Sequence, residues 1–252
     1  MRYDLAELRR SLKPFRLHWY PTVGSTNTKA AQLRRGGKLF APACVLTGRQ
    51  TSGRGRGTNL WHAPRGVMTV TFAIPTSESV LPHHVPLIAG LAVRNACAEL
   101  GAPGVGLKWP NDLWHDDLKL AGLLCERIDH VDLVGVGLNV NVDPRKLPAG
   151  LRGKATTLAA LTAQPLGLTH VLLTVARHLS QLLLKHEQAP STLLQTYSKH
   201  LVLTGRRIRI VDGTDVIEGQ CEGIDRVGRL LVAVPSSGRR AFTSGNVSLA
   251  TA

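Results

Sequence analysis

The chain has 252 residues, and its 31 Lys and Arg outnumber its 17 Asp and Glu, which gives a formal net charge of +14. Hydrophobic residues make up 43% of the sequence, as in ordinary packed domains, so a disordered basic tail is excluded and one or two domains are expected. No apolar run reaches the roughly 18 residues of a membrane span, and the first residues lack the apolar core of a signal peptide. We therefore expect a cytoplasmic protein with no membrane partner.

The order of apolar runs and turn residues predicts an α+β body. A turn at residues 24–27, rich in small polar side chains, is expected to cap a helix that runs to Arg35, where two glycines end it. His83 and His84 precede another helix, where we expect a solvent-exposed cap. Residues 144–153 are expected to form a mobile loop. Further predicted helices cover residues 5–11, 85–100, 169–185 and 191–201, and predicted strands cover residues 17–20, 43–47, 67–74, 106–109, 119–125 and 132–140.

The pattern changes after Thr204, where short apolar runs alternate with turns that contain glycine or serine. Predicted strands cover residues 207–211, 216–223, 230–234, 240–243 and 247–249. Short strands at this spacing are typical of a small β-barrel or sandwich. We therefore expect two domains, residues 1–203 and residues 204–252.

The basic surplus is concentrated near the start of the chain, where residues 1–56 hold 12 Lys and Arg but only 2 Asp and Glu. Such a segment is typical of a protein whose partner carries several negative charges, or of a solvated basic face. Nucleic acid is one such partner, although aromatic residues are only 4% of the chain and no RNP or zinc-finger spacing is present. The four cysteines are far apart and include no C-x-x-C pair, so buried thiols are expected rather than a metal site or disulfides.

The clearest candidate for chemistry is a loop at residues 50–57 in which glycine and arginine alternate. Glycine lets backbone amides approach an anion, and guanidinium groups clamp phosphate or carboxylate oxygens. The loop is not a Walker A motif, because Arg54 and Gly55 stand where Lys and Ser or Thr are required. A flexible solvated turn is the alternative explanation. The distinctive residues of this segment are Gln50, Gly53, Arg54, Gly55 and Arg56, followed by Trp61.

A second candidate lies at residues 108–112 and continues at Lys119. Asn111 and Asp112 fall at a predicted turn, where they suit a hydroxyl group, an adenine edge or a divalent cation, although ordinary turns use the same residues. Lys119 opens an apolar strand, where its ammonium group would face a carboxylate or a phosphate unless it reaches solvent at the edge. No histidine pair has metal-ligand spacing, and no G-x-S-x-G motif indicates a covalent hydrolase.

Taken together, these segments resemble the biotin protein ligase family. The resemblance covers residues 17–142, and the C-terminal strands are similar to the SH3-like domain of the family. It implies a core like that of class II aminoacyl-tRNA synthetases, in which biotin and ATP lie over a mixed sheet with flanking helices. The motifs follow the family's order: Ser25-Thr26-Asn27, Gln50 with Gly53-Arg54-Gly55-Arg56 and Trp61, Lys108-Trp109-Pro110-Asn111-Asp112, Lys119-Leu120-Ala121-Gly122-Leu123-Leu124, and Gly137-Leu138-Asn139-Val140.

The resemblance also implies an activity and its residues. Biotin would be activated with ATP and Mg²⁺ as biotinyl-5′-AMP and transferred to a lysine of a biotin carboxyl carrier protein of the acetyl-CoA carboxylase type. Arg54, Arg56 and Lys119 would be catalytic, because they offset the repulsion between the biotin carboxylate and the α-phosphate. The implied biotin-binding residues are Ser25, Thr26, Asn27, Gln50, Gly53, Arg54, Gly55, Arg56 and Lys119. The implied ATP-binding residues are Arg54, Arg56, Trp61, Asn111, Lys119 and Asn139, with Asp112 as a magnesium contact.

Two departures from the family pattern affect the expected function. Thr58 and Asn59 replace a second Gly-Arg pair, which removes a phosphate-facing cation and makes the sequence compatible with a degenerate ligase that binds biotin without activating it. About 20 residues precede the core, which leaves no room for the helix-turn-helix domain of ligases that repress transcription, so sequence-specific DNA binding is not expected. The sequence is also compatible with a lipoate-type protein ligase, with a non-enzymatic basic RNA-binding protein, and with a homodimer.

Overall fold

The computed structural model describes residues 3–78, 80–235 and 237–250. Within these residues the body of the protein is built on a seven-stranded mixed sheet with the spatial order β1-β2-β5-β9-β8-β7-β6. β1 and β2 pair in parallel, and the other neighbours in this sheet pair antiparallel. The strands are β1 (Arg16–Tyr20), β2 (Ala43–Thr47), β5 (Val67–Pro75), β6 (Gly106–Lys108), β7 (Asp112–His115), β8 (Leu118–Ile128) and β9 (Val131–Asn139).

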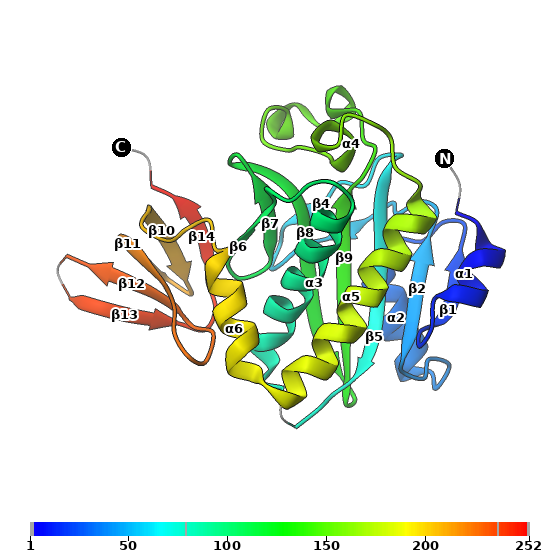
Figure 1. The fold of residues 1–252 in the computed structure, drawn as a ribbon, viewed down its shortest axis with the longest axis horizontal. Helices are drawn as coiled ribbons and strands as arrows, with labels where there is room; N and C mark the ends of the chain where they lie inside the picture. The colour runs from blue at the N-terminus through cyan, green and yellow to red at the C-terminus, as the bar shows by residue number, and fades with distance from the viewer. Residues whose placement is uncertain (1–2, 79, 236, 251–252) are drawn as a thin grey trace.

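Helices cover both faces of this sheet (Figure 1). α3 (Val85–Glu99) and α5 (Leu168–Gln188) pack together across one face, and α2 (Thr26–Arg35) packs against β5 and β9 on the other. No helix in the described part of the chain is long and apolar enough to cross a membrane. The other helices are α1 (Leu5–Ser11), α4 (Leu158–Leu161) and α6 (Pro190–Lys199), with 3-10 turns at Pro82–His84, Pro144–Lys146 and Ala149–Leu151.

Two-sided burial explains the sequence of β2, in which every residue is buried. Because side chains alternate between the two faces of a strand, Cys44 and Leu46 join the core under α3 and α5, whereas Ala43 and Val45 pack with Ala30 of α2. A strand covered on both faces is therefore a continuous apolar run rather than an alternating one. This explains why the strand is predictable from its sequence.

The last part of the chain forms a second sheet, seen at the left of Figure 1. Among the described residues it has five antiparallel strands in the order β13-β12-β11-β10-β14. Gly213 and Gly228 lie in its turns with φ of 62° and 80°, the left-handed region that favours glycine. Each strand expected after Thr204 is present. The strands are β10 (Arg207–Asp212), β11 (Asp215–Ile224), β12 (Leu230–Val234), β13 (Gly238–Phe242) and β14 (Asn246–Leu249).

A turn of this second sheet packs against the body and buries His84. The indole Nε1 of Trp109 donates to the carbonyl oxygen of Gly228 at 3.2 Å, and Nε2 of His84 lies 2.9 Å from the carbonyl oxygen of Val227. His84 is only 5% exposed, so the expectation of a solvent-exposed cap is wrong for this residue. The physical reason is that a turn far along the chain covers the start of α3, and no local pattern reveals such a contact.

The sequence pattern also misses four short elements. These are β3 (Gly53–Arg54), β4 (Leu60–Trp61), β7 and α4. Each has two to four residues, which is too few for a hydrophobic period to be recognised. The cysteines agree with the prediction: Cys44, Cys97 and Cys221 are buried free thiols, Cys125 is partly buried, and burial raises the pKa of Cys97 to about 12.

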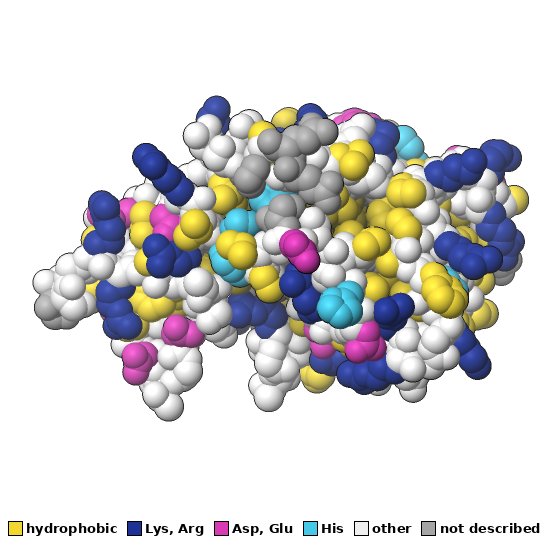
Figure 2. All heavy atoms as spheres, turned by 90° about the horizontal axis from the view of Figure 1, so that it is seen from below, with side chains coloured by type: hydrophobic (Ala, Val, Ile, Leu, Met, Phe, Trp, Pro, Cys, Tyr) yellow, Lys and Arg dark blue, Asp and Glu magenta, His cyan; other side chains and the backbone are white. Residues whose placement is uncertain are grey.

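The basic surplus of the N-terminal region lies on the surface. In the view of Figure 2, Lys and Arg side chains are spread over the whole face, including the end of the molecule opposite the second sheet. Four side chains of the N-terminal region are exposed: Arg9 and Arg10 of α1, Lys13 after α1, and Arg16 of β1. These side chains are therefore open to solvent.

Burial of His84 has a consequence for stability. Desolvation lowers the pKa of His84 below the usual 6.5, although the Val227 carbonyl opposes this effect. Because the folded chain favours neutral imidazole, the unfolded chain binds more protons as the pH falls below 6.5, and the free energy of unfolding decreases. We expect urea titrations to give a lower free energy of unfolding at pH 5 than at pH 7, and His84→Gln to reduce that difference.

The matched control is His62→Gln, which changes an exposed histidine. It should keep the wild-type difference between the two pH values. If His84→Gln also keeps the full difference, burial of this imidazole does not contribute to the acid sensitivity of the fold.

Candidate active site

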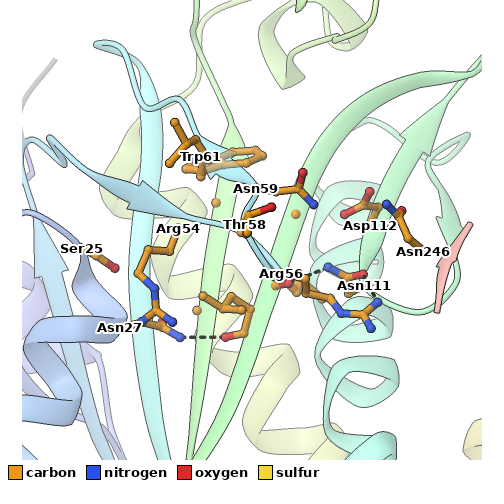
Figure 3. A pocket seen from close by; sticks show the side chains of 18 of the residues that line it. Ser25, Asn27, Arg54, Arg56, Thr58, Asn59, Trp61, Asn111, Asp112 and Asn246 are labelled. Atoms are coloured by element: carbon orange, nitrogen blue, oxygen red, sulfur yellow. Dashed lines mark hydrogen bonds between the residues drawn. The ribbon is translucent and has the colours of Figure 1, made fainter. Parts of the chain in front are cut away.

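A cavity of about 870 Å³ lies on the face of the main sheet that carries α2 (Figure 3). Its lining comes from the start of α2, from the hairpin of β3 and β4, from β8 and β9, and from the turn between β6 and β7. Two turns of the second sheet complete it. Segments from both ends of the chain therefore meet at one site.

The floor of the cavity is formed by glycines. Gly122 of β8 is paired with Gly137 of β9, so this patch of the sheet carries no side chains. The indole ring of Trp61 lies against it, because a Cβ atom at Gly137 would collide with the indole and one at Gly122 would lie 3.3 Å from it. In the described part of the chain the buried Nε1 of Trp61 has no hydrogen-bond partner. The glycines thus leave the space that the indole of Trp61 fills on the sheet.

The hairpin above this floor is formed by the Gly-Arg segment. β3 and β4 pair antiparallel, with Gly53 opposite Trp61 and Arg54 opposite Leu60. A Cβ atom at Gly53 would collide with the carbonyl oxygen of Trp61, so only glycine permits this close approach of the two strands. Gly53 therefore shapes the hairpin and does not line the cavity itself.

The start of α2 presents polar groups to one end of the cavity. The turn at residues 24–27 caps the helix, as expected: Ser25 is the N-cap residue, and its hydroxyl accepts a hydrogen bond from the first turn of the helix. The backbone N–H of Thr26 donates to Oε1 of Gln50 at 2.9 Å. Asn27 is only 2% exposed, and its Oδ1 accepts from the Thr71 hydroxyl at 2.6 Å. These hydrogen bonds hold the helix start rigidly against β5 and the segment after β2.

Lys119 enters the cavity from the beginning of β8. Its Nζ lies 2.8 Å from Oδ1 of Asp112 and 5.7 Å from the centre of the Trp61 ring. Nδ2 of Asn139 donates to the carbonyl oxygen of Thr156 at 3.2 Å and lies 3.5 Å from that of Lys119. Asn139 is 5% exposed and does not line the cavity, so in this structure its amide supports the backbone around Lys119.

Arg56 connects the hairpin with the second sheet. Its Nη1 donates to the carbonyl oxygen of Gly245 at 3.0 Å and lies 3.4 Å from Oδ1 of Asn111 (Figure 3). The sequence pattern does not single out the C-terminal residues, because they occur in short turns that any small β domain contains. The cavity-lining residues from this sheet are Val211, Asp212, Gly213, Ser244, Gly245 and Asn246.

The structure brings most of the sequence-predicted site residues together. Gly53 and Asn139 lie outside the lining, for the reasons given above. Glu126 contacts Arg54 and is missed by the sequence pattern, although an acidic residue in an apolar strand is the available signal. The predicted residues that line the cavity are Ser25, Thr26, Asn27, Gln50, Arg54, Gly55, Arg56, Trp61, Asn111, Asp112 and Lys119.

Asp112, the expected magnesium contact, is the carboxylate to consider as a metal ligand in the cavity. Among the described residues, no three His, Cys, Asp or Glu side chains gather as a metal site. Mg²⁺ is commonly held by one or two carboxylates together with water and the phosphates of a nucleotide. A single carboxylate next to Asn111 therefore suits an ion that arrives with a nucleotide, and it does not suit a resident metal.

The fold and the cavity together define a class of protein. Three cationic side chains from the hairpin and β8, together with polar groups at one end, suit a small ligand with more than one anionic group. The protein is therefore an α+β protein built to bind such ligands between a sheet and a basic hairpin.

Comparisons with known proteins give the family. Residues 19–143 match the Biotin/lipoate A/B protein ligase family, and residues 203–250 match the Biotin protein ligase C terminal domain. The biotin--[acetyl-CoA-carboxylase] ligase of Mycobacterium tuberculosis is 31% identical over 84% of this chain and 81% of its own length. The bifunctional ligase/repressor BirA of Bacillus subtilis is 27% identical over 91% of this chain and 73% of its own length.

The fold comparison agrees. The biotin protein ligase from Aquifex aeolicus, solved in complex with biotin and ATP, superposes with a TM-score of 0.84 and 27% identity over 94% of this chain and 99% of that one. The chain belongs to the biotin protein ligase family. The resemblance inferred from the ordered motifs is thereby confirmed, and the expected core with a C-terminal SH3-like module is the observed fold.

The contact between Trp61 and Gly137 predicts how the hairpin responds to a methyl group. In Gly137→Ala the new Cβ displaces the indole of Trp61, so the hairpin loses this packing contact with the sheet. We expect trypsin to cleave after Arg54 or Arg56 at least about threefold faster than in the wild type, because protease access follows local opening. Mass spectrometry of the fragments measures this rate.

Gly150→Ala is the control, because no atom lies within 4 Å of a Cβ at that position. It should leave cleavage of the hairpin unchanged. Equal rates in Gly137→Ala and the wild type would show that the glycine floor does not hold the hairpin.

Proposed function

We propose that this chain activates biotin with ATP as biotinyl-5′-AMP and transfers the biotinyl group to a lysine of a carrier protein. The observation that carries the proposal is the convergence of Arg54, Arg56 and Lys119 on one cavity. These cations come from different parts of the chain, and only the fold brings the hairpin and β8 together. Membership of the biotin protein ligase family supports the assignment.

The chemistry requires these cations. In the first step a carboxylate oxygen of biotin attacks the α-phosphorus of ATP and pyrophosphate leaves, so two anions must be held in contact. Arg54, Arg56 and Lys119 offset their repulsion and stabilise the charge that develops during transfer. In the second step the neutral amine of the acceptor lysine attacks the acyl carbon, an amide forms, and AMP leaves with loss of the amine proton. The hairpin limits access of water to the anhydride.

We assign recognition of the biotin ureido group to the polar end of the cavity. Ser25, Thr26 and Gln50 line this end, and Asn27 lies beside them. Their hydrogen bonds to each other fix the donors and acceptors before the ligand arrives, which reduces the ordering cost of binding. The uncharged end of biotin thus meets preorganised polar groups, and its carboxylate extends toward the cations.

We assign the nucleotide to the other end, near Trp61, Asn111 and Asp112. Mg²⁺ bound to the phosphates supplies charge neutralisation, and Asp112 would give it one carboxylate contact. Thr58 and Asn59, which replace the Gly-Arg pair of the family, line the cavity. Their hydroxyl and amide groups offer neutral hydrogen bonds where the family has a cation. We therefore expect activation of biotin to persist and to depend less on the side chains at positions 58 and 59 than it does in the family.

The acceptor is proposed to be a biotin carboxyl carrier domain. The Mycobacterium tuberculosis relative is named as a ligase for acetyl-CoA carboxylase. This agrees with the carrier of the acetyl-CoA carboxylase type that the family resemblance implies. A net charge of +14 favours an acidic partner through steering of association.

The test is transfer of labelled biotin to a purified carrier domain with ATP and Mg²⁺. We expect Arg54→Ala, Arg56→Ala and Lys119→Ala each to lower kcat by about 100-fold or more, as loss of a charge-stabilising group does elsewhere. Arg177→Ala removes an arginine that pairs with Glu99 on the opposite face of the sheet, and it should retain wild-type transfer.

Three outcomes would contradict the proposal. Activation of lipoate in place of biotin would indicate a lipoate-type ligase. Biotin binding without formation of biotinyl-5′-AMP would indicate a degenerate ligase. Wild-type transfer by all three cavity variants would remove the cations from the chemistry.

A further inference from the structure

Glu126 occupies a defined position on the cavity face of β8. Side chains alternate along a strand, so Gly122, Leu124 and Glu126 project to the same face. Gly122 and Leu124 are paired across to Gly137 and Gly135 of β9 and line the cavity. Glu126 is the next residue in this row, and its side chain is 29% exposed.

The two carboxylate oxygens of Glu126 meet two different segments of the site. Oε1 accepts from Nη2 of Arg54 at 2.8 Å, and Oε2 accepts from Nδ2 of Asn27 at 2.8 Å. Arg54 belongs to the hairpin above the cavity, whereas Asn27 belongs to the start of α2 beside it. One carboxylate thus connects the part of the site that would hold the ligand anion with the part that would hold its neutral ring.

The Asn27 end of this connection is fixed. The amide of Asn27 also donates to the carbonyl oxygen of Leu124 at 3.0 Å, and its Oδ1 accepts from Thr71. A Cβ atom at Gly135 would collide with this Oδ1, so the glycine is what lets the amide reach the strand. Since Asn27 cannot shift, Glu126 is held in one orientation by a buried partner.

The Arg54 end is the movable one. The Arg54 side chain is 47% exposed, and among the described residues its other hydrogen bond is the weaker one from Nη1 to the Thr28 hydroxyl at 3.4 Å. An ion pair with this exposure adds little to stability, because water and salt screen it. Its effect is to choose one orientation for a long, flexible side chain, and the remaining N–H groups of the guanidinium stay available for a ligand.

We propose that Glu126 is a positioning residue that fixes the Arg54 guanidinium over the cavity for the activation step. The inference rests on the proposed function. Orientation before the ligand arrives matters because a displacement of about 1 Å can cost about 100-fold in rate. Glu126 acts through Arg54 and does not itself touch the reacting atoms.

Glu126→Gln is the informative variant. Its amide oxygen can still accept from Asn27, whereas its NH₂ group faces Arg54 and cannot accept from it. We expect kcat for biotin-dependent release of pyrophosphate from ATP to fall about 10-fold or more, with the KM for biotin changed by less than about threefold. Thermal unfolding should match the wild type, which separates this effect from misfolding.

The matched control is Glu99→Gln, which breaks a similarly exposed carboxylate-arginine pair with Arg177 outside the cavity. It should leave both kinetic parameters unchanged. Thr28→Ala removes the weaker contact of Arg54 and should reduce kcat less than Glu126→Gln does.

A double-mutant cycle tests the route through Arg54. If Glu126 works by positioning Arg54, then Arg54→Ala combined with Glu126→Gln should be no slower than Arg54→Ala alone. Losses that multiply, or a Glu126→Gln variant with wild-type kcat, would overturn the inference while the wild-type enzyme still activates biotin. A wild-type chain that does not activate biotin would instead overturn the proposed function, and the inference with it.

Discussion

Three cationic side chains lie around one cavity, where they repel one another. Each of them is held by a carboxylate or a carbonyl oxygen of the protein itself. Lys119 faces Asp112, Arg54 faces Glu126, and Arg56 donates to the Gly245 carbonyl oxygen. The Arg54 pair is half-exposed, and such pairs contribute about 0–1 kcal/mol. That is small beside the interactions of a guanidinium with a phosphate in a closed site, so an anionic ligand can still bind strongly to these side chains through their remaining N–H groups. The acceptors therefore hold the cations in place without blocking their use.

The sheet provides the geometry on which these contacts depend. α3 and α5 bury one face, which leaves the other face free to carry α2 and the cavity. On that face Gly122, Gly135 and Gly137 remove side chains where Trp61 and Asn27 must approach the strands. Glycine in the middle of a sheet weakens packing. Here the missing side chains make room for the residues of the site, so these glycines contribute to the cavity and not to the core.

The sequence predicts what depends on local chemistry. Ser25 is recognisable as a helix cap because the signal lies in a few adjacent residues. The long strands and helices are recognisable because their apolar patterns extend over many residues, and the ordered motifs identify most of the cavity lining. Contacts between distant segments are not predictable: His84 is covered by a turn of the second sheet, and Glu126 is one charged residue in a strand until its partners Arg54 and Asn27 are known. The short hairpin strands β3 and β4 exist only through their pairing with each other.

The hydrogen bond between Arg56 and Gly245 has an evolutionary consequence. A C-terminal module with its own sheet and its own turns is the kind of unit that could be exchanged between proteins. Its turn nevertheless supplies a backbone acceptor to an arginine of the hairpin, and further residues of the module line the same cavity. Recombination that joins the body of one ligase to the module of another would therefore assemble a hybrid binding site, so the two parts are expected to be inherited as a matched pair.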